Sequence, residues 1–252
     1  MKMENPLLGT LSPRALRMVS GGMWHEEPRE RADVTRILRS HGIEPTEALL
    51  YFQERFGGLE YQIRGRPEGW RFGLIGNEVD YLRDSQFATA LNHRTEQLSF
   101  AIHYQSGEIF VNDYSGWIAI ASCAKKLVES DALIDEIVDV WRTGVYIFLG
   151  QYLKSNILFE KGLLEANLKI AKVDEASDQY TTWWANDRLR IIRRVFYSSK
   201  EPWDCAEMYA RDVSEARRLV AALAERGVYK RDGEISCFPH PFDPTPVYQG
   251  VP

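Results

Sequence analysis

The sequence is poor in cysteine and has no long apolar run. Its three cysteines, Cys123, Cys205 and Cys237, are widely scattered and lack the spacing of a metal site. We therefore expect reduced thiols, as is usual in the cytoplasm. No run of about 18 apolar residues occurs, and the N-terminus lacks the apolar stretch of a signal peptide, so the sequence predicts a cytoplasmic protein that does not span a membrane.

The sequence also lacks a basic surplus and the common cofactor motifs. A net charge of −5 argues against general nucleic-acid binding, which needs a basic surface, but it suits an acidic surface that meets a basic partner. We find no phosphate-binding loop, dinucleotide fingerprint or nucleophile elbow, so no cofactor is predicted. The one dense cluster of metal-ligand types is His25, Glu26 and Glu27. Adjacent residues point in different directions, so we interpret it as a solvated acidic turn and predict no metal site.

The segment that organises the first half of the chain is 43–59, which has the pattern of one amphipathic helix. Leu49, Phe52 and Phe56 fall on one face, and Pro45 suits the first turn. The Gly57-Gly58 pair follows. We predict that Gly57 ends the helix in the left-handed conformation and that the chain then passes from helix to sheet.

Two further helices are expected before this segment. Ser12 is a good N-cap and Pro13 a good first helical residue, and Gly21-Gly22 would end that helix. Trp24 follows and is interpreted as a structural core residue. A second helix is predicted over 29–40, with Gly42 after it.

Strand patterns follow the helices. Residues 60–75 alternate loosely and predict two short strands. The ranges 100–104 and 108–111 flank Gly107 and predict a tight hairpin, to which 117–121 adds a third strand. The fold class is therefore predicted to be α+β, with an antiparallel-rich sheet packed against helices.

The second half of the chain has weaker patterns. We predict helices over 122–129 and 130–141, a mostly helical stretch over 145–169, and a polar seam over 172–182. Trp183 and Trp184 are expected to point to opposite sides of a strand, one in and one out. Strands at 189–197 and 206–209 and a helix from Asp212 follow, and the proline-rich end is predicted to be an extended tail.

The order of these features resembles the SUKH superfamily of bacterial immunity proteins, and most closely its third subfamily. The features are a small residue and Trp24, a helix, a glycine break, a helix that ends in Phe56-Gly57-Gly58-Leu59, and a hairpin with Ser-Gly at its turn. The resemblance covers about residues 11–133. Relatives usually carry Gly-Arg shortly after the Trp, whereas here Trp24 is followed by 25–28, His-Glu-Glu-Pro.

The resemblance implies a SUKH-like core over residues 1–133. Residues 134–252 are then a C-terminal extension, which is either a separate domain or packs onto the core as one body. The family binds and neutralises protein toxins, many of them nucleases or nucleic-acid deaminases, so the implied function is non-enzymatic and the implied partner is a toxin. The residues alone leave two alternatives open. One is an enzyme with a Cys–His site, drawing on Cys123 or Cys237 with His93, His103 or His240. The other is a regulatory scaffold.

One acidic stripe offers a partner-binding site. Asp131, Asp135 and Asp139 recur at every fourth residue of the helix predicted over 130–141, and Glu129 and Glu136 add charge nearby. Like charges at this spacing destabilise a helix by about 0.2–0.5 kcal/mol per pair. We therefore weigh a docking surface for a basic toxin groove against an ordinary solvated face.

Overall fold

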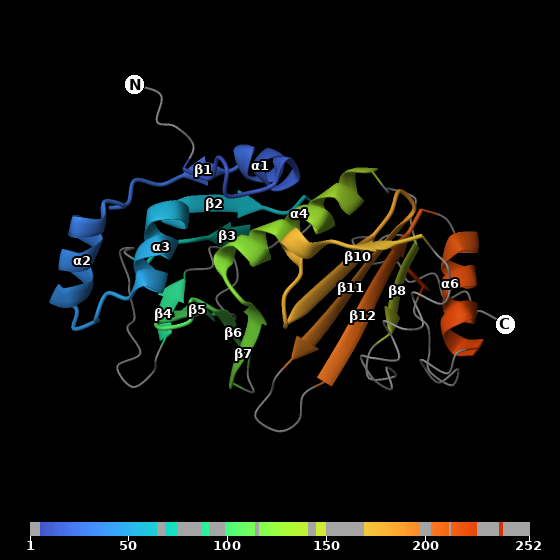
Figure 1. Cartoon of the computed structure of the whole chain (residues 1–252). Helices are drawn as coiled ribbons and strands as arrows, with labels where there is room; N and C mark the ends of the chain where they lie inside the picture. The colour runs from blue at the N-terminus through green and yellow to red at the C-terminus, as the bar shows by residue number, and fades with distance from the viewer. Residues whose placement is uncertain are drawn as a thin grey trace. The chain divides into compact units, whose positions relative to one another are not determined.

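The chain folds into two compact units, and the residues that the structure describes form three antiparallel sheets and several helices (Figure 1). The computed structural model describes residues 6–64, 69–74, 87–90, 99–113, 116–140, 145–149, 169–196, 203–211, 213–225 and 237–238. The N-terminal unit is Met1–Asp135 and the C-terminal unit is Glu136–Pro252. The boundary lies two residues beyond the division predicted at 133, whereas the polar segment 172–182 lies inside the C-terminal unit. The α+β class is confirmed.

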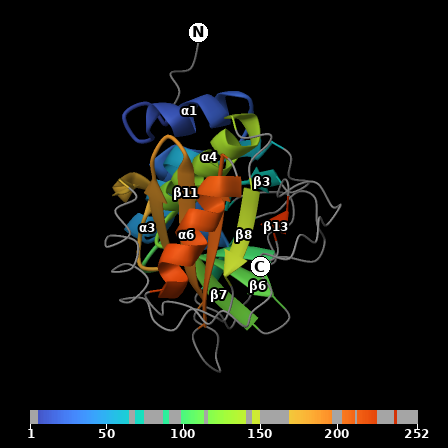
Figure 2. The ribbon, with the colours of Figure 1, turned by 90° about the vertical axis from the view of Figure 1, so that its right-hand side faces the viewer.

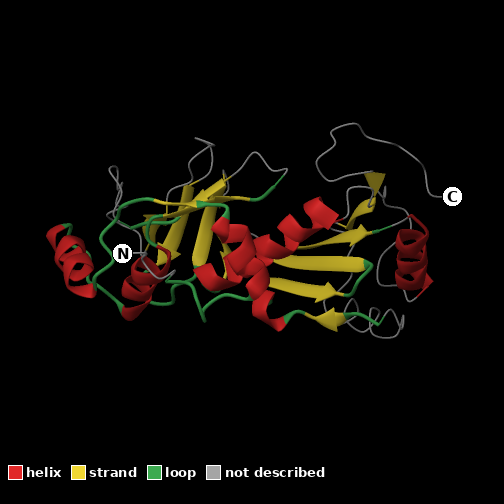
Figure 3. Cartoon of the chain, turned by 90° about the horizontal axis from the view of Figure 1, so that it is seen from above, coloured by secondary structure: helices red, strands yellow, loops and turns green. Residues whose placement is uncertain are grey.

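The N-terminal unit begins with three helices, α1 (Pro13–Ser20), α2 (Arg31–Ser40) and α3 (Glu47–Phe56). Ser12 caps α1 as predicted, because its Oγ accepts a hydrogen bond from the Ala15 amide at 3.2 Å. Thr46 caps α3 in the same way, so Pro45 lies just before the cap and not in the first turn. Figures 1 and 3 show α2 beside α3, with which it is in contact. The buried side of α2 carries Val34 and Leu38.

Two sheets complete this unit. The first has the order β1-β2-β3, formed by β1 (Met23–Trp24), β2 (Leu59–Gln62) and β3 (Gly69–Arg71). The second has the order β4-β5-β6-β7, formed by β4 (Phe87–Ala90), β5 (Ser99–His103), β6 (Ile109–Asp113) and β7 (Gly116–Ala121). The predicted hairpin and third strand are confirmed, and Gly107 has the positive φ of 74° that its turn requires.

Aromatic side chains from α3 and the first sheet form the core of the N-terminal unit. The Phe72 ring lies within about 6 Å, between centroids, of the rings of Phe52, Phe56 and Tyr61. The Trp70 ring meets Phe100 of the second sheet edge-on at 4.3 Å. The predicted apolar face of α3 therefore packs against Phe72 at the end of the first sheet, and Trp70 links that sheet to the second.

Residues 124–140 form one continuous helix, α4 (Ala124–Val140), where two helices were predicted. Neither Ser130 nor its neighbours interrupt it, because no glycine or proline occurs in this range. The helix begins in the N-terminal unit, and its residues from Glu136 onward belong to the C-terminal unit.

The C-terminal unit is built on a six-stranded sheet of order β13-β8-β12-β11-β10-β9. Its strands are β8 (Val145–Leu149), β9 (Ala171–Lys172), β10 (Thr181–Ala185), β11 (Leu189–Phe196), β12 (Trp203–Ala210) and β13 (Cys237–Phe238). A 3₁₀ turn, η1 (Asp174–Ala176), and the helix α6 (Val213–Glu225) complete the described part. Figure 2 shows α6 lying across the strands, where Leu219 and Leu223 are buried.

Two predictions for this unit are wrong. Residues 145–149 form a strand and not a helix, because their β-branched and aromatic side chains suit a strand that pairs along its whole length with β12. Trp183 and Trp184 are both buried, whereas one was expected to face out, since β10 is buried on both of its faces. The strands at 189–197 and 206–209 and the helix after Asp212 are confirmed. The predicted proline-rich tail from 239 lies outside the described residues, as does the part of the predicted helical stretch that spans 150–168.

Candidate functional site

The acidic stripe predicted as a partner-binding surface is largely buried. The side chains of Glu129, Asp131 and Asp135 belong to residues that are 0%, 5% and 5% exposed, so these three cannot form a docking face in this structure. The interpretation of the stripe as an ordinary solvated face is wrong for the same reason. Apolar residues of α4 are buried as well: Leu127, Val128, Leu133, Ile134 and Ile137.

Glu129 is held by the start of α1. Its two carboxylate oxygens accept hydrogen bonds from the backbone N–H and the hydroxyl of Ser12, each at 2.6 Å. Arg14 adds a cation at 3.9 Å. Ser12 therefore has two roles, because its Oγ accepts from the first turn of α1 and donates to α4. A buried carboxylate is tolerated when it is bonded in this way.

Asp131 and Asp135 are held by β2 and the residues that follow it. The Tyr61 hydroxyl donates to Asp131 Oδ2 at 2.8 Å. Burial, and then the Asp131 charge, raise the pKa of Tyr61 well above its ordinary value, so the phenol remains a donor. Arg64 donates to Asp135 from its backbone N–H at 2.9 Å and from its guanidinium at 2.6–3.0 Å. All three carboxylates thus anchor α4 within the N-terminal unit.

The remaining two predicted residues lie at the end of the helix. Glu136 is half-buried and forms an ion pair with Arg190 of β11 at 3.8 Å. Asp139 belongs to α4, but its side chain lies outside the described residues. The structure describes the side chains of four of the five predicted residues, and among these four Glu136 is the only one with substantial exposure.

The glycines after α3 have a different division of roles from the one predicted. Gly57 was predicted to take the left-handed conformation, but its φ is −55°, whereas Gly58 has the positive φ of 81°. A Cβ at Gly58 would collide with the backbone oxygen of His25, so Gly58 also permits the close approach of β1. A Cβ at Gly57 would lie 2.5 Å from the backbone oxygen of Gln53. Both glycines are structural, as predicted, but for separate steric reasons.

Trp24 is half-buried on β1, and the guanidinium carbon of Arg29 lies 5.1 Å from its ring centroid. This is the geometry of a cation–π contact. The contact links the end of β1 to a residue just before α2. Trp24 was predicted to be a core residue, and that prediction is wrong because its side chain is only half-buried.

Glu27 of the connection between β1 and α2 belongs to a polar cluster, which we define as Glu27, Gln53 of α3 and Arg71 of β3. Gln53 is fully buried on α3. Its amide nitrogen donates to Glu27 Oε2 at 3.1 Å and to the Pro28 carbonyl at 3.0 Å, and its amide oxygen accepts from the Leu74 N–H at 2.7 Å. One side chain thus joins three segments of the chain.

Glu27 is the acidic member of the cluster, and its side chain is only 4% exposed. The solvated acidic turn predicted for this position is therefore wrong. Arg71 approaches Glu27 Oε1 at 3.6 Å, which is beyond hydrogen-bond distance. Burial raises the pKa of Glu27, and the Gln53 hydrogen bond and the Arg71 and His25 charges oppose this shift without cancelling it.

Gln53 was not among the predicted site residues, although the sequence carries a signal for it. Position 53 is four residues after Leu49 and three before Phe56, so it lies on the face of α3 that carries the buried residues. A polar residue on an apolar helix face predicts a buried hydrogen bond. The partners, Glu27 and Leu74, are 26 and 21 residues away and have no local pattern that reveals them.

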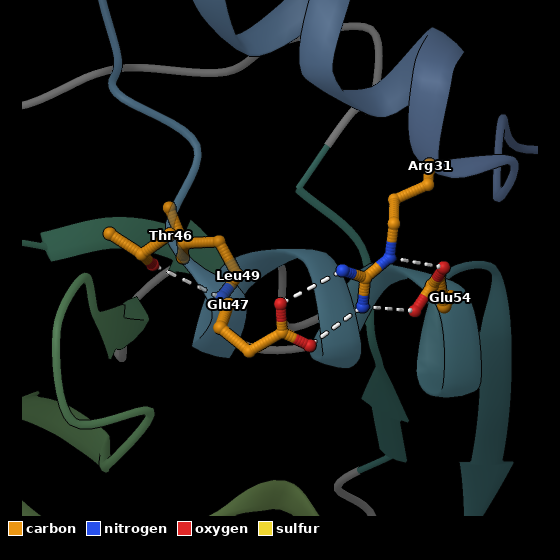
Figure 4. Close-up of polar contacts among 5 residues, drawn as sticks. All are labelled: Arg31, Thr46, Glu47, Leu49 and Glu54. Carbon is orange, nitrogen blue, oxygen red and sulfur yellow. Dashed lines mark hydrogen bonds and ion pairs between the residues drawn. The ribbon is translucent and has the colours of Figure 1, made fainter.

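On the surface, Arg31 clamps α2 to α3, as Figure 4 shows. Its guanidinium donates to both oxygens of Glu47 and both of Glu54, at 2.7–3.1 Å. The hydrogen bonds from Arg31 lower the pKa of Glu47. These residues are exposed or half-exposed, so the clamp aligns the two helices more than it stabilises them.

The alternative Cys–His site can be followed only in part. His103 lies in β5, where its Nδ1 lies 2.9 Å from the Ser106 hydroxyl within the same hairpin. Cys123 is half-buried just before α4, whereas His93 and His240 lie outside the described residues. Within the described ranges, no group of three His, Cys, Asp or Glu side chains is arranged to hold a metal ion.

None of the described helices combines the length and the apolar character needed to cross a membrane. Comparison with models of known protein families, with curated proteins and with solved structures finds no match for this chain.

Proposed function

We propose that this chain is a cytoplasmic, non-enzymatic immunity protein with a SUKH-like N-terminal unit that binds and blocks a protein toxin. The observation that carries the proposal is the order of elements in the N-terminal unit. A helix is followed by the short Trp24 strand, by two helices of which the second ends at Gly57-Gly58, and later by the Gly107 hairpin. This order is the one on which the resemblance rests.

The charge of the chain supports a basic partner. The net charge is −5, and proteins that act on nucleic acids carry basic surfaces. The buried acids of α4 are occupied within the N-terminal unit, so the toxin must be met by other residues. Large apolar side chains that are exposed in the described part, Leu8, Met23 and Tyr51, are the positions at which mapping of the contact should start.

The experiment uses the product of the gene immediately upstream, where an immunity protein's toxin is expected. The toxin domain is expressed in a sensitive host with and without this chain, and the purified pair is examined by calorimetry and by titration of toxin activity. We expect restored growth, a stable complex and loss of toxin activity that ends at a fixed molar ratio. Failure to rescue growth together with failure to form a complex would refute the proposal.

The same titration separates sequestration from catalysis. One molecule of an enzyme that modifies its target inactivates many molecules of toxin, whereas one molecule of an inhibitor inactivates a fixed number of toxin molecules, set by the stoichiometry of the complex. His103→Ala and Cys123→Ser should therefore leave neutralisation intact in folded protein. Loss of protection in either variant, with an unchanged unfolding transition, would favour the Cys–His enzyme instead.

A further inference from the structure

Glu27 is a carboxylate in an unusual position for an acidic residue. Its side chain is nearly completely buried, between the connection that follows β1 and the Gly73 backbone. A Cβ added to Gly73 would lie 2.6 Å from Glu27 Oε1, so a larger residue at this position would displace the carboxylate. Among the described residues, Oε1 has no hydrogen-bond partner, although it is shielded from water. A buried charge with an unsatisfied oxygen destabilises the closed arrangement.

The groups around Glu27 come from each element packed against it. His25 directly follows β1, and its Nε2 is 2.6 Å from Glu60 Oε2 of β2. Arg71, at the end of β3, provides the nearest cation among the described residues, and Gln53 of α3 donates a hydrogen bond to Oε2. The nearest cation is thus too distant for a hydrogen bond, and the Nε of Arg71 also has no hydrogen-bond partner in the part of the chain that the structure describes.

The same cluster links the connection after β1 to the segment after β3. Gln53 binds Glu27 and Pro28 on this connection and Leu74 on the segment after β3. If the Glu27 carboxylate moves toward water, Gln53 loses a partner, and its bond to the Leu74 amide loses support. The state of a single carboxylate is therefore transmitted to two segments that are distant in sequence.

We propose that Glu27 is a proton-dependent latch, which in its neutral form holds the β1–α2 connection closed on Gln53 and in its ionised form releases it. A neutral carboxyl keeps its bond to the Gln53 amide and needs no hydration of its charge. An ionised carboxylate gains free energy by reaching water, which requires the connection to move, because the Arg71 cation 3.6 Å away offsets only part of the cost of burying the charge. This inference concerns regulation within the N-terminal unit and does not depend on the proposed immunity function.

The direction of the pH dependence follows from the raised pKa of Glu27. The folded protein binds this proton more tightly than the unfolded chain does. The stabilisation is therefore complete below the ordinary value of 4.5 and is lost as the pH rises through the folded-state pKa. Because one proton is involved, the equilibrium constant changes by at most about tenfold per pH unit.

The local test measures hydrogen exchange at the Leu74 amide, expressed as a protection factor so that intrinsic exchange cancels. Glu27→Gln mimics the neutral carboxyl, because its amide oxygen can still accept from Gln53. We expect protection at Leu74 to fall with rising pH in the wild type and to stay level in the variant. Glu54→Gln, a neighbouring change on α3 that leaves Glu27 in place, should respond to pH as the wild type does. Level protection in the wild type would overturn the latch.

The global test compares the stability of wild type and Glu27→Gln by chemical unfolding at several pH values above and below the ordinary carboxyl range. The wild type should lose stability relative to the variant as the pH rises. A constant difference, or one of opposite sign, would overturn the proposal. If the variant does not fold, carbon-13 titration of the wild-type Glu27 carboxyl decides: a midpoint above the ordinary value supports the latch, and one at or below it refutes it.

Discussion

Tyr61 and Asp131 are joined inside the N-terminal unit by a hydrogen bond of 2.8 Å between residues 70 positions apart. Tyr61 is 2% exposed and Asp131 is 5% exposed, so water replaces neither partner. The bond ties β2 to the middle of α4. It makes Asp131, which the sequence presented as a surface charge, part of the interior.

Tyr61→Phe is expected to destabilise the protein by about 1–3 kcal/mol, because it leaves the buried Asp131 carboxylate without this donor. The measurement is the free energy of unfolding in denaturant. Tyr51→Phe is a matched control, since Tyr51 is 41% exposed, and it should change the free energy by less than about 0.5 kcal/mol. Equal effects of the two changes would mean that the buried bond contributes nothing.

Arg64→Ala should destabilise the N-terminal unit by about 1–2 kcal/mol. It removes the guanidinium bonds to the buried Asp135, but the backbone bond remains and Arg64 itself is half-exposed, which limits the loss. Arg36→Ala is the control, because Arg36 pairs with Asp33 on the exposed side of α2. Unfolding curves of both variants check the prediction, which would be contradicted if Arg36→Ala were the more harmful change.

Gly58→Ala should cost more than Gly42→Ala. Both glycines have positive φ, and an alanine in this conformation costs on the order of 1–2 kcal/mol. The added Cβ has open space at Gly42 but meets the His25 backbone at Gly58. The midpoint of thermal unfolding measures the difference, and equal losses would show that strand β1 yields freely to the added methyl group.

Acid should weaken the Arg31 clamp. The pKa of Glu47 is lowered in the folded protein, so its contribution is present above the ordinary value of 4.5 and is lost as the pH falls through the folded-state value. Arg31→Gln should therefore reduce the loss of stability between about pH 6 and about pH 3, and the effect should shrink in high salt. Arg36→Gln, which does not touch Glu47, is the comparison. A wild-type acid response in Arg31→Gln would disprove the coupling.

The buried acids of α4 change how docking can be tested. Replacing Asp131, Asp135 and Asp139 together with lysine would place cations beside Tyr61 and Arg64, inside the unit. We expect this triple variant to fail to fold cooperatively, as judged by circular dichroism and thermal unfolding. Loss of toxin binding by this variant would then reflect its unfolding and not a lost contact surface. The toxin contact should therefore be mapped by substitutions at exposed positions.

Local patterns were enough for elements whose determinants are close in sequence. Ser12 caps α1 three residues away, Gly107 makes its turn between adjacent strands, and Leu49, Phe52 and Phe56 share a face because a helix repeats every 3.6 residues. Each of these depends on a few neighbouring residues, so no distant partner was needed to predict it.

Distant partners decided the rest. The aspartates of α4 recur at every fourth residue, as they would in a solvated stripe. Their burial, and that of Glu129, is possible because hydrogen-bond partners come from distant segments: Ser12 for Glu129, Tyr61 for Asp131 and Arg64 for Asp135, at separations of 117, 70 and 71 residues. Residues 145–149 have an apolar pattern that fits a helix or a strand, and pairing with β12 selects the strand. Gln53 and Glu27 form one cluster only after α3 packs against the first sheet. A residue's spacing sets which face it occupies, whereas the burial of that face and the partners of its polar groups depend on segments that meet only in the folded chain.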